Sequence, residues 1–302
     1  MKSVWVLLIL LVTRVAGAQS AAFSTIDTIN DARGVLSLIQ SLDKAGKYKY
    51  LTVSDTLSIN NKYCKCEAQK KRVAPWVKAD FDKNGYTDLL AIGDEHRQVL
   101  LLIMAYSGNV FSIDRLNYGH KYCSLPVVNL KKQSVLKLTT FRRAPGGKLG
   151  SRRKYSLSYK FGGFLETTNL TSGKEIQSVS LKYHFAYKEI KQIDITVSLN
   201  GTVTYKETGE KVEELTTLLP SATYNELAKL LNYIDFVHLK NKYGRDENHQ
   251  PSYTLKVTYS DGEKEIYDQG GEGSFGLELV YKRLLELRKT QQWQPVSPPS
   301  TR

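Results

Sequence analysis

One stretch of this chain places oxygen-bearing side chains at alternate positions and then leads directly into an apolar run. The oxygen-bearing residues are Asp80, Asp82, Asn84 and Asp88. A glycine at position 85 supplies a sharp bend, and the apolar run covers positions 89–92. A hard cation such as Ca²⁺ takes about six to eight oxygen ligands, and alternation in a tight loop turns several oxygens toward one point. The sequence therefore predicts a metal-binding turn followed by a buried strand.

We predict that this loop binds calcium. The ligands would be the side chains of Asp80, Asp82, Asn84 and Asp88, with the backbone carbonyl of Tyr86. An EF-hand loop would carry a bidentate glutamate where this chain has Ala91, so water would have to complete the shell and affinity would be weak. The alternative is a turn whose Asp and Asn side chains accept hydrogen bonds from their own backbone.

The N-terminus has the pattern of a secretory signal peptide over residues 1–18. Lys2 gives a positive start, positions 4–12 are apolar, and small residues at 16–18 offer a cleavage site. The alternative is a membrane anchor, although the apolar run is short for a bilayer. No later segment is apolar enough to be transmembrane, so we expect the mature protein to be secreted or periplasmic.

The charge balance of the chain is strongly basic, with a formal net charge of +13. This favours an anionic partner such as a surface polymer, an anionic lipid or a nucleic acid, and a cell-surface protein is a further possible partner. The alternative is that the basic surface only keeps the protein soluble. Six of the basic residues lie in the segment 142–154, which we predict to be a loop and which Phe141 and Tyr155 flank. They are Arg142, Arg143, Lys148, Arg152, Arg153 and Lys154. Such a loop could hold a polyanion through charge and stacking. The alternative is a solvated hairpin tip.

The three cysteines, Cys64, Cys66 and Cys123, all lie in the first half of the chain. In an oxidising compartment they predict one disulfide and one free thiol. A bridge between Cys64 and Cys66 would close a strained ring, so we expect Cys123 to pair with one of those two. Zinc is the alternative, but a zinc site needs about four ligands and only His120 lies nearby in the sequence.

Hydrophobic periodicity divides the chain into two parts. The first part, 19–176, predicts one helix at 28–42 that is capped by Thr28 and Asp31, and a loop at 59–75. Strands are predicted at 48–53, 76–79, 88–92, 99–105, 110–114, 126–129, 135–140, 155–160 and 162–167.

The second part, 177–293, alternates strands with helices. We predict a hairpin turn at Asn200-Gly201, a helix that begins with a capping box of Thr223 and Glu226, a hairpin over 253–267, and a last helix. The Gly-rich segment 270–273 is interpreted as a flexible loop, with an anion cradle as the alternative. The expected fold class is α+β: a β-rich N-terminal domain with one helix, then an antiparallel sheet with two helices on one face. The tail, 294–302, is predicted to be disordered.

Two resemblances accompany these patterns. The stretch from Asp80 to Gly93 resembles a single FG-GAP or VCBS type repeat, which implies calcium on a loop of a β-sheet unit. Residues 177–292 resemble a bacterial domain of unknown function through the segments 200–205, 233–236 and 239–243. The combination resembles secreted bacterial proteins without known activity. Those proteins have a Cys-x-Gly-x-Cys-Pro segment where this chain has no cysteine, so no redox or metal role is carried over from it.

Motifs for catalysis are lacking in the sequence. It contains no Gly-x-Ser-x-Gly, no His-Glu-x-x-His and no phosphate-binding glycine loop. The histidines are scattered, at His96, His120, His184, His238 and His249. We interpret His238 as a partly buried packing residue. The sequence thus predicts an exported, non-catalytic binding or interaction protein with a structural calcium site. The alternatives are an extracytoplasmic hydrolase with an unrecognised site, and a cell-surface or assembly accessory factor.

Overall fold

The computed structural model describes most of the chain after the N-terminus. The described residues are 22–57, 59, 61–95, 98–116, 123–129, 135–143, 148–168, 173–186, 190–209, 212–244 and 250–296. The predicted signal peptide, 1–18, lies outside them, as does most of the predicted tail. None of the helices in the described part is long and apolar enough to cross a membrane.

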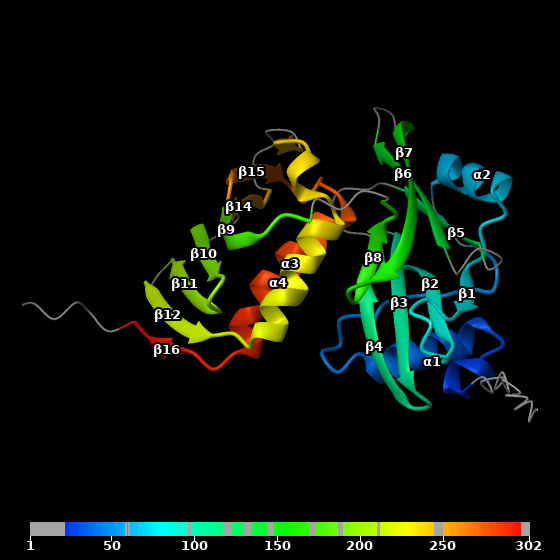
Figure 1. Ribbon diagram of the computed structural model, residues 1–302. Coiled ribbons are helices and arrows are strands. Elements are labelled where there is room, and N and C mark those ends of the chain that lie inside the picture. Colours follow the sequence, from blue (N-terminus) through cyan, green and yellow to red (C-terminus); the bar gives the residue numbers. More distant parts are fainter. Residues whose placement is uncertain are drawn as a thin grey trace, which may run out of the picture.

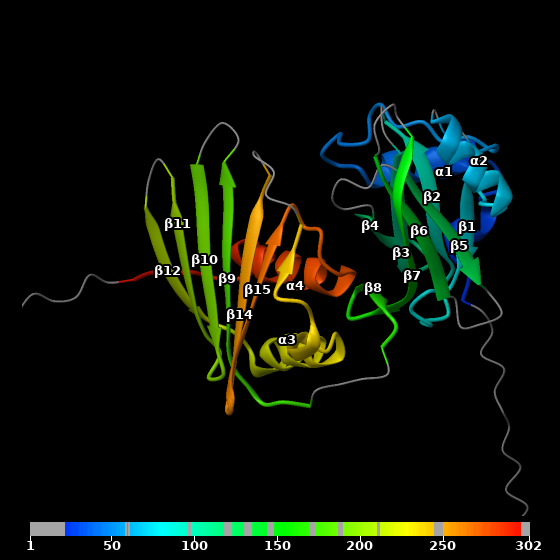
Figure 2. The same cartoon turned by 90° about the horizontal axis from the view of Figure 1, so that it is seen from above.

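The described chain forms three β-sheets and a few helices, which confirms a mixed α+β class. The sheets fall into two halves that lie side by side (Figures 1 and 2). The N-terminal half holds two four-stranded sheets, and the C-terminal half holds one sheet of eight strands.

The first sheet is an antiparallel meander in chain order. Its strands are β1 (Trp76–Ala79), β2 (Asp88–Asp94), β3 (Gln98–Ser107) and β4 (Val110–Arg115). The middle strands are buried on both faces. One face packs against α1 (Ala32–Leu42), and the other faces the second sheet. This double burial explains why β2 and β3 are continuous apolar runs without alternation.

The second sheet is also a meander. It consists of β5 (Cys123–Asn129), β6 (Val135–Arg143), β7 (Leu149–Lys160) and β8 (Gly163–Glu166). Its inner residues, such as Leu125, Leu138 and Leu157, share one core with Leu100 and Leu102 of the first sheet. A short helix, α2 (Lys62–Lys70), packs on the same core.

The third sheet runs in the order β13-β15-β14-β9-β10-β11-β12-β16. The strands are β9 (Ile176–Ala186), β10 (Ile190–Ser198), β11 (Thr202–Thr208), β12 (Glu213–Leu218), β13 (Lys242–Tyr243), β14 (Ser252–Tyr259), β15 (Gly262–Gln269) and β16 (Gln294–Pro295). All neighbours are antiparallel except β13 and β15. Two helices, α3 (Ser221–Tyr233) and α4 (Phe275–Thr290), cover one face (Figure 2).

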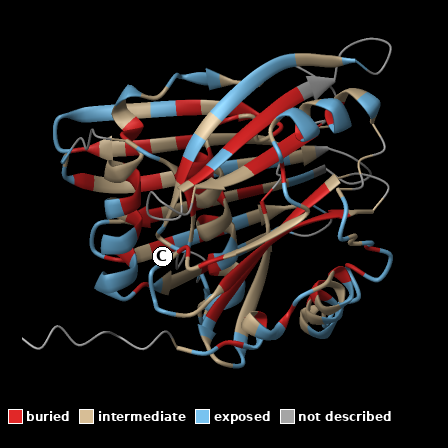
Figure 3. Ribbon diagram, turned by 90° about the vertical axis from the view of Figure 1, so that its right-hand side faces the viewer, coloured by how far each residue is buried: buried red, intermediate tan, exposed pale blue. Residues whose placement is uncertain are grey.

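The last helix joins the two halves of the molecule. Most of its buried residues belong to the core of the third sheet, but Phe275 at its start belongs to the core of the N-terminal half. Lys282 Nζ donates to Asp114 Oδ2 at 2.6 Å, and Arg283 bonds the carbonyl of Phe161. The buried residues form two core clusters in the N-terminal half and one beneath the helices of the third sheet, and Figure 3 marks the buried segments in red.

Several local predictions are confirmed. The Asn200-Gly201 turn joins β10 to β11, and Gly201 adopts a φ of 83° that suits a residue without a Cβ. The hairpin predicted over 253–267 is the pair β14–β15. In each case two alternating runs flank a turn residue, so the signal is entirely local.

Other predictions are wrong. The start of the helix predicted at 28–42 is wrong: the helix is present as α1 but begins at Ala32 with Asp31 as its cap, and Thr28 ends a separate 3₁₀ turn (Thr25–Thr28) that Ser24 and Asp27 cap. The predicted strand 48–53 makes only the bridge between Thr52 and Asp94. The predicted loop 59–75 contains α2, so the described residues of the N-terminal half form two α-helices rather than one.

The capping box of Thr223 and Glu226 is also wrong. Helix α3 begins at Ser221, directly after Pro220, with no side-chain cap. The helix thus starts two residues before the predicted cap, and the carbonyl of Pro220 accepts the amides of Thr223 and Tyr224 in its first turn. A further 3₁₀ turn (Phe236–His238) follows α3.

Candidate functional site

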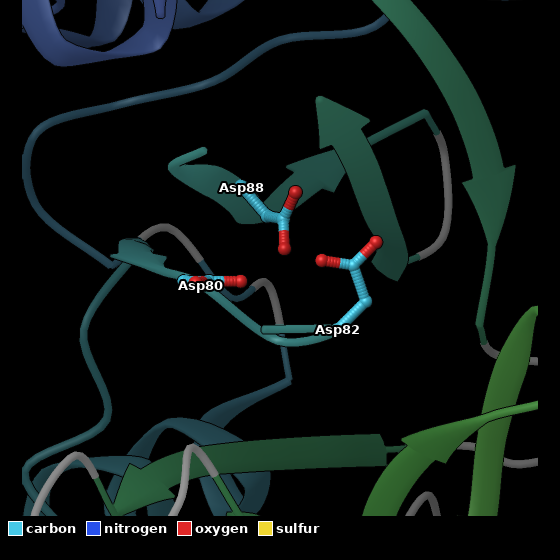
Figure 4. A group of neighbouring side chains, drawn as sticks. All are labelled: Asp80, Asp82 and Asp88. Carbon is cyan, nitrogen blue, oxygen red and sulfur yellow. The ribbon is translucent and has the colours of Figure 1, made fainter. Parts of the chain in front are cut away.

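The loop between β1 and β2 brings three carboxylates together (Figure 4). Asp80 and Asp82 come from the loop, and Asp88 is the first residue of β2. One oxygen from each of the three lies within 4.8 Å of the others. The loop reaches this shape because Lys83 and Gly85 take left-handed backbone angles, with φ of 65° and 90°. Residues other than glycine seldom adopt a positive φ, so the backbone of the turn is constrained at Lys83.

Asp88 is the buried member of the group, with 0 % of its surface exposed. Its Oδ2 accepts the amide of Phe81 at 2.8 Å, and its Oδ1 accepts the amide of Ala105 on β3 at 2.9 Å. Burial raises the pKa of this carboxyl to about 7, and the nearby charges of Asp82 and Asp80 add to the rise. The two amide bonds act in the opposite direction.

The other two carboxylates accept amides of their own loop. Asp80 accepts from Asn84 at 3.2 Å and from Gly85 at 3.0 Å, and Asp82 accepts from Asn84 at 3.1 Å. Burial also raises the pKa of Asp82, followed in size by the lowering effect of its amide bond. These are the hydrogen bonds expected from the alternative interpretation, in which the Asp and Asn side chains of the turn accept from its own backbone amides. They leave further lone pairs on each carboxylate, so the donor set fits a hard cation.

Asn84 takes a different orientation from the one that the calcium prediction requires. Its Nδ2 donates to the carbonyl of Ala105 at 2.6 Å and to Asp82 at 3.2 Å, while its Oδ1 accepts the amide of Tyr86 at 2.8 Å. Because both ends of the amide have matched partners, its orientation is fixed by the network. Of the predicted side-chain ligands, the structure thus groups Asp80, Asp82 and Asp88, and it leaves the Asn84 oxygen engaged with Tyr86.

The disulfide prediction is confirmed. Cys64 on α2 and Cys123 at the start of β5 form the bridge, with Cα atoms 6.0 Å apart, and Cys66 is a free, exposed thiol. This resolves the choice that the sequence leaves open. It also argues against zinc, because two of the three thiols are already bonded.

The basic segment lies on a hairpin of β6 and β7, so the prediction of a continuous loop at 142–154 is wrong. Arg142 and Arg143 end β6, and their side chains lie outside the described part. Lys148 directly precedes β7, and three more basic residues lie on that strand: Arg152, Arg153 and Lys154. All four are exposed. We call these six residues the basic hairpin.

Stacking at the basic hairpin is not available from the predicted aromatic residues. Phe141 is buried in the core between the first two sheets. Tyr155 packs edge-to-face on Phe275, with ring centroids 5.1 Å apart. The hairpin therefore offers charge, without the flanking aromatic surfaces that the sequence suggested.

A second buried aspartate escaped the sequence reasoning. Asp268, near the end of β15, has 0 % of its surface exposed and accepts the amides of Glu272 at 2.8 Å and Gly273 at 3.0 Å. Burial raises the pKa of its carboxyl to about 6. The Gly-rich segment 270–273, interpreted as a flexible loop, is thus tied to a buried side chain. The only signal in the sequence was an aspartate shortly before two glycines.

The start of α4 does hold an anion, but it is a side chain of this protein. The Glu166 carboxylate, at the end of β8, accepts the amides of Phe275 at 2.9 Å and Gly276 at 3.3 Å. The positive end of the helix dipole favours such a carboxylate. This contact was invisible in the sequence because 109 positions separate Glu166 from Phe275.

The histidines form no cluster within the described residues. The side chain of His238 is 73 % exposed and its Nδ1 lies 2.8 Å from Asp235, so the interpretation as a packing residue is wrong. His184 is exposed on the open face of the third sheet. His96, His120 and His249 lie outside the described residues.

The comparisons with known proteins cover only the C-terminal half. The model of a family described as a domain of unknown function, DUF6438, matches residues 179–288, while no FG-GAP or VCBS repeat is identified. No curated protein and no solved structure matches the chain. The prediction of a domain of unknown function in the second part is therefore confirmed, and the repeat-like loop stays a resemblance.

Proposed function

We propose that this chain is an exported, non-catalytic binding or interaction protein whose N-terminal half holds a structural calcium ion. The observation that carries the proposal is the convergence of Asp80, Asp82 and Asp88 within 4.8 Å. Like charges this close repel each other, and a cation at their centre would relieve the repulsion. The signal-like N-terminus and the Cys64–Cys123 bridge support export, because disulfides persist in oxidising compartments.

The ion would serve the fold rather than a reaction. Phe81 lies between two of the carboxylates in sequence and packs edge-to-face on Phe164 of β8, with centroids 5.2 Å apart. The amide of Phe81 is held by Asp88. A cation that fixes the loop would therefore also fix the contact between the first two sheets.

The partner that we propose is an anionic polymer, held in part by the basic hairpin. Lys148, Arg152, Arg153 and Lys154 are exposed, and the chain is basic overall. Multiple cations along one arm favour a polyanion through the release of counterions.

A calcium titration of the chelator-stripped protein tests the first part of the proposal. The expected dissociation constant is on the order of 10⁻⁴–10⁻³ M, the range of extracellular calcium sites. At tenfold excess over that constant, calcium should raise the free energy of unfolding by about 1.4 kcal/mol. Asp80→Asn should abolish the gain, whereas Asp261→Asn, in an exposed turn of the other half, should keep it. Identical unfolding curves in calcium and in chelator would refute the calcium site.

A heparin column with a salt gradient tests the second part. Replacing Lys148, Arg152, Arg153 and Lys154 by Gln should lower the salt concentration at elution. The matched control replaces Arg33, Lys44, Lys49 and Lys229, which are also exposed, and removes the same formal charge. If both variants elute together, the hairpin is only part of a general positive surface and the assignment fails.

A further inference from the structure

A cavity of about 380 Å³ opens in the N-terminal half, away from the three-carboxylate loop. Helix α2 forms one wall with Lys65, the segment 52–57 forms another with Thr52, Ser54 and Thr56, and strand β2 contributes Asp94. Apolar side chains, Ile92 among them, complete the lining. The volume lies at the lower end of the range of about 300–1,000 Å³ that is typical of small-molecule sites.

The walls are tied to one another, so the cavity is preformed. Thr52 and Asp94 exchange both backbone hydrogen bonds, each at 3.0 Å. Gly93 lies beside this contact, where a Cβ would lie 2.6 Å from the Leu51 side chain and 3.2 Å from the Thr52 carbonyl oxygen. The Cys64–Cys123 bridge fixes α2 one residue away from Lys65. A cavity with fixed walls spares a ligand the cost of ordering them.

The chemistry of the lining is that of hydroxyl groups between one cation and one carboxylate. The hydroxyl of Thr52 donates to the Asp94 carbonyl at 3.2 Å, and the hydroxyls of Ser54 and Thr56 lie 3.4 Å apart. Each hydroxyl oxygen has acceptor capacity left over for a ligand. Lys65 offers up to three donors on an exposed ammonium.

We infer that this cavity binds one acidic sugar unit, a hydroxylated ring with a single carboxylate such as a uronic acid. The carboxylate pairs with Lys65, and the ring hydroxyls meet the three hydroxyl side chains and Asp94. The apolar walls face the C–H groups of the ring. Asp94 disfavours ligands with several negative charges, such as a phosphate, because like charges repel in a confined site. The inference rests on the proposed function only in taking an anionic polymer as the partner.

Amide chemical shifts of the full chain, titrated with sodium glucuronate, test this inference. Glucuronate should shift the amides of residues 52–57 and of Asp94, and glucose, which lacks the carboxylate, should bind roughly tenfold more weakly. Lys65→Gln should weaken glucuronate binding by a similar factor. The matched control is Lys62→Gln, an exposed lysine on the same helix that does not line the cavity.

The outcomes separate this site from the others. Shifts that require both the ligand carboxylate and Lys65 support the inference, and they should persist in the basic-hairpin variant and in chelator. Absence of shifts at residues 52–57, equal binding of glucose and glucuronate, or unchanged binding in the Lys65 variant each overturns it. None of these results depends on whether the calcium titration or the heparin column succeeds.

Discussion

Among the described residues, each half of the molecule has one aspartate that is completely buried and holds a loop. In the N-terminal half Asp88 accepts two backbone amides, and in the C-terminal half Asp268 does the same. Both have 0 % of their surface exposed. In both, burial is the largest cause of a raised pKa, to about 7 for Asp88 and about 6 for Asp268. The two halves thus share the same local arrangement, a buried carboxylate that accepts two backbone amides.

The difference lies in what surrounds each carboxylate. Asp88 has two more carboxylates close by, Asp80 and Asp82. Asp268 faces the buried phenol of Tyr281, whose pKa is raised first by burial and then by the charge of Asp268. A buried carboxylate with two amides is therefore an ordinary way to fix a loop and says nothing about metal by itself. Convergence of further carboxylates is what distinguishes a candidate cation site.

The halves also differ in covalent ties, and this gives the largest expected effect. The Cys64–Cys123 bridge spans 59 positions in the N-terminal half, whereas the C-terminal half contains no cysteine. Replacing both cysteines by Ala should lower the stability of the N-terminal half by about 4 kcal/mol, because the bridge restricts its unfolded chain. Hydrogen exchange should speed up in β5–β7 and stay unchanged in β9–β11. Cys66→Ala is the matched control and should change neither; equal loss in both halves would contradict the prediction.

Replacing each buried aspartate by alanine should separate the role that the two share, holding a loop, from the role proposed for Asp88 alone, binding calcium. Asp268→Ala leaves the part-buried amide of Glu272 and the buried amide of Gly273 without their acceptor, which should lower the free energy of unfolding by about 3 kcal/mol at roughly 1.5 per donor. The loss should be the same in calcium and in chelator. Asp88→Ala should lose a similar amount in chelator and more in calcium.

Urea unfolding with and without calcium measures both variants. Asp261→Ala, at an exposed ion pair, serves as control and should change the free energy of unfolding far less than either variant. A calcium-dependent loss in the Asp268 variant, or none in the Asp88 variant, would show that the two sites are not distinguished by their neighbours.

What the sequence predicted correctly was local. The β14–β15 hairpin and the turn at Gly201 depend on neighbouring residues alone. Helix α2 was missed because its sequence is polar, with only Cys64 and Ala68 buried, and it depends on Asn61 as cap and on a distant disulfide partner. Tertiary context, not propensity, forms that helix.

At the candidate site, too, only the features that depend on neighbouring residues could be predicted from the sequence. The grouping of Asp80, Asp82 and Asp88 followed from their spacing. The orientation of Asn84 did not, because it is set by the Ala105 carbonyl on a strand that pairs from elsewhere in the chain. Asp268 gave almost no signal, since its burial depends on how α4 packs.

The raised pKa of Asp268 predicts a pH effect confined to one half. Below about pH 3 its carboxyl is protonated in both the folded and the unfolded state. As pH rises toward 6, the unfolded chain releases this proton before the folded protein does, so stability falls. A shift of about two pH units corresponds to about 2.7 kcal/mol. Glu272 and the phenols of Tyr281, Tyr253 and Tyr243 face the group.

The comparison of Asp268→Asn with the parent protein isolates this effect, because the amide does not titrate. The variant should be less stable than the parent near pH 3, and the deficit should shrink by up to about 2.7 kcal/mol by pH 7. Denaturant unfolding at several pH values measures it, and other titrating groups cancel in the difference. A deficit that stays constant across this range would be incompatible with the raised pKa.

The smallest expected effect concerns the contact that joins the halves. Glu166→Gln keeps one acceptor for the amides of Phe275 and Gly276 but removes the charge at the start of α4, which should cost about 1 kcal/mol. Ser274→Ala, which removes the helix's own cap at Leu277, should cost a similar amount. The two differ in where the loss appears. Hydrogen exchange in the Glu166 variant should rise in β8 as well as in α4, because the bond crosses between halves. In the Ser274 variant it should rise in α4 alone, and identical profiles would mean that Glu166 acts only as a second cap.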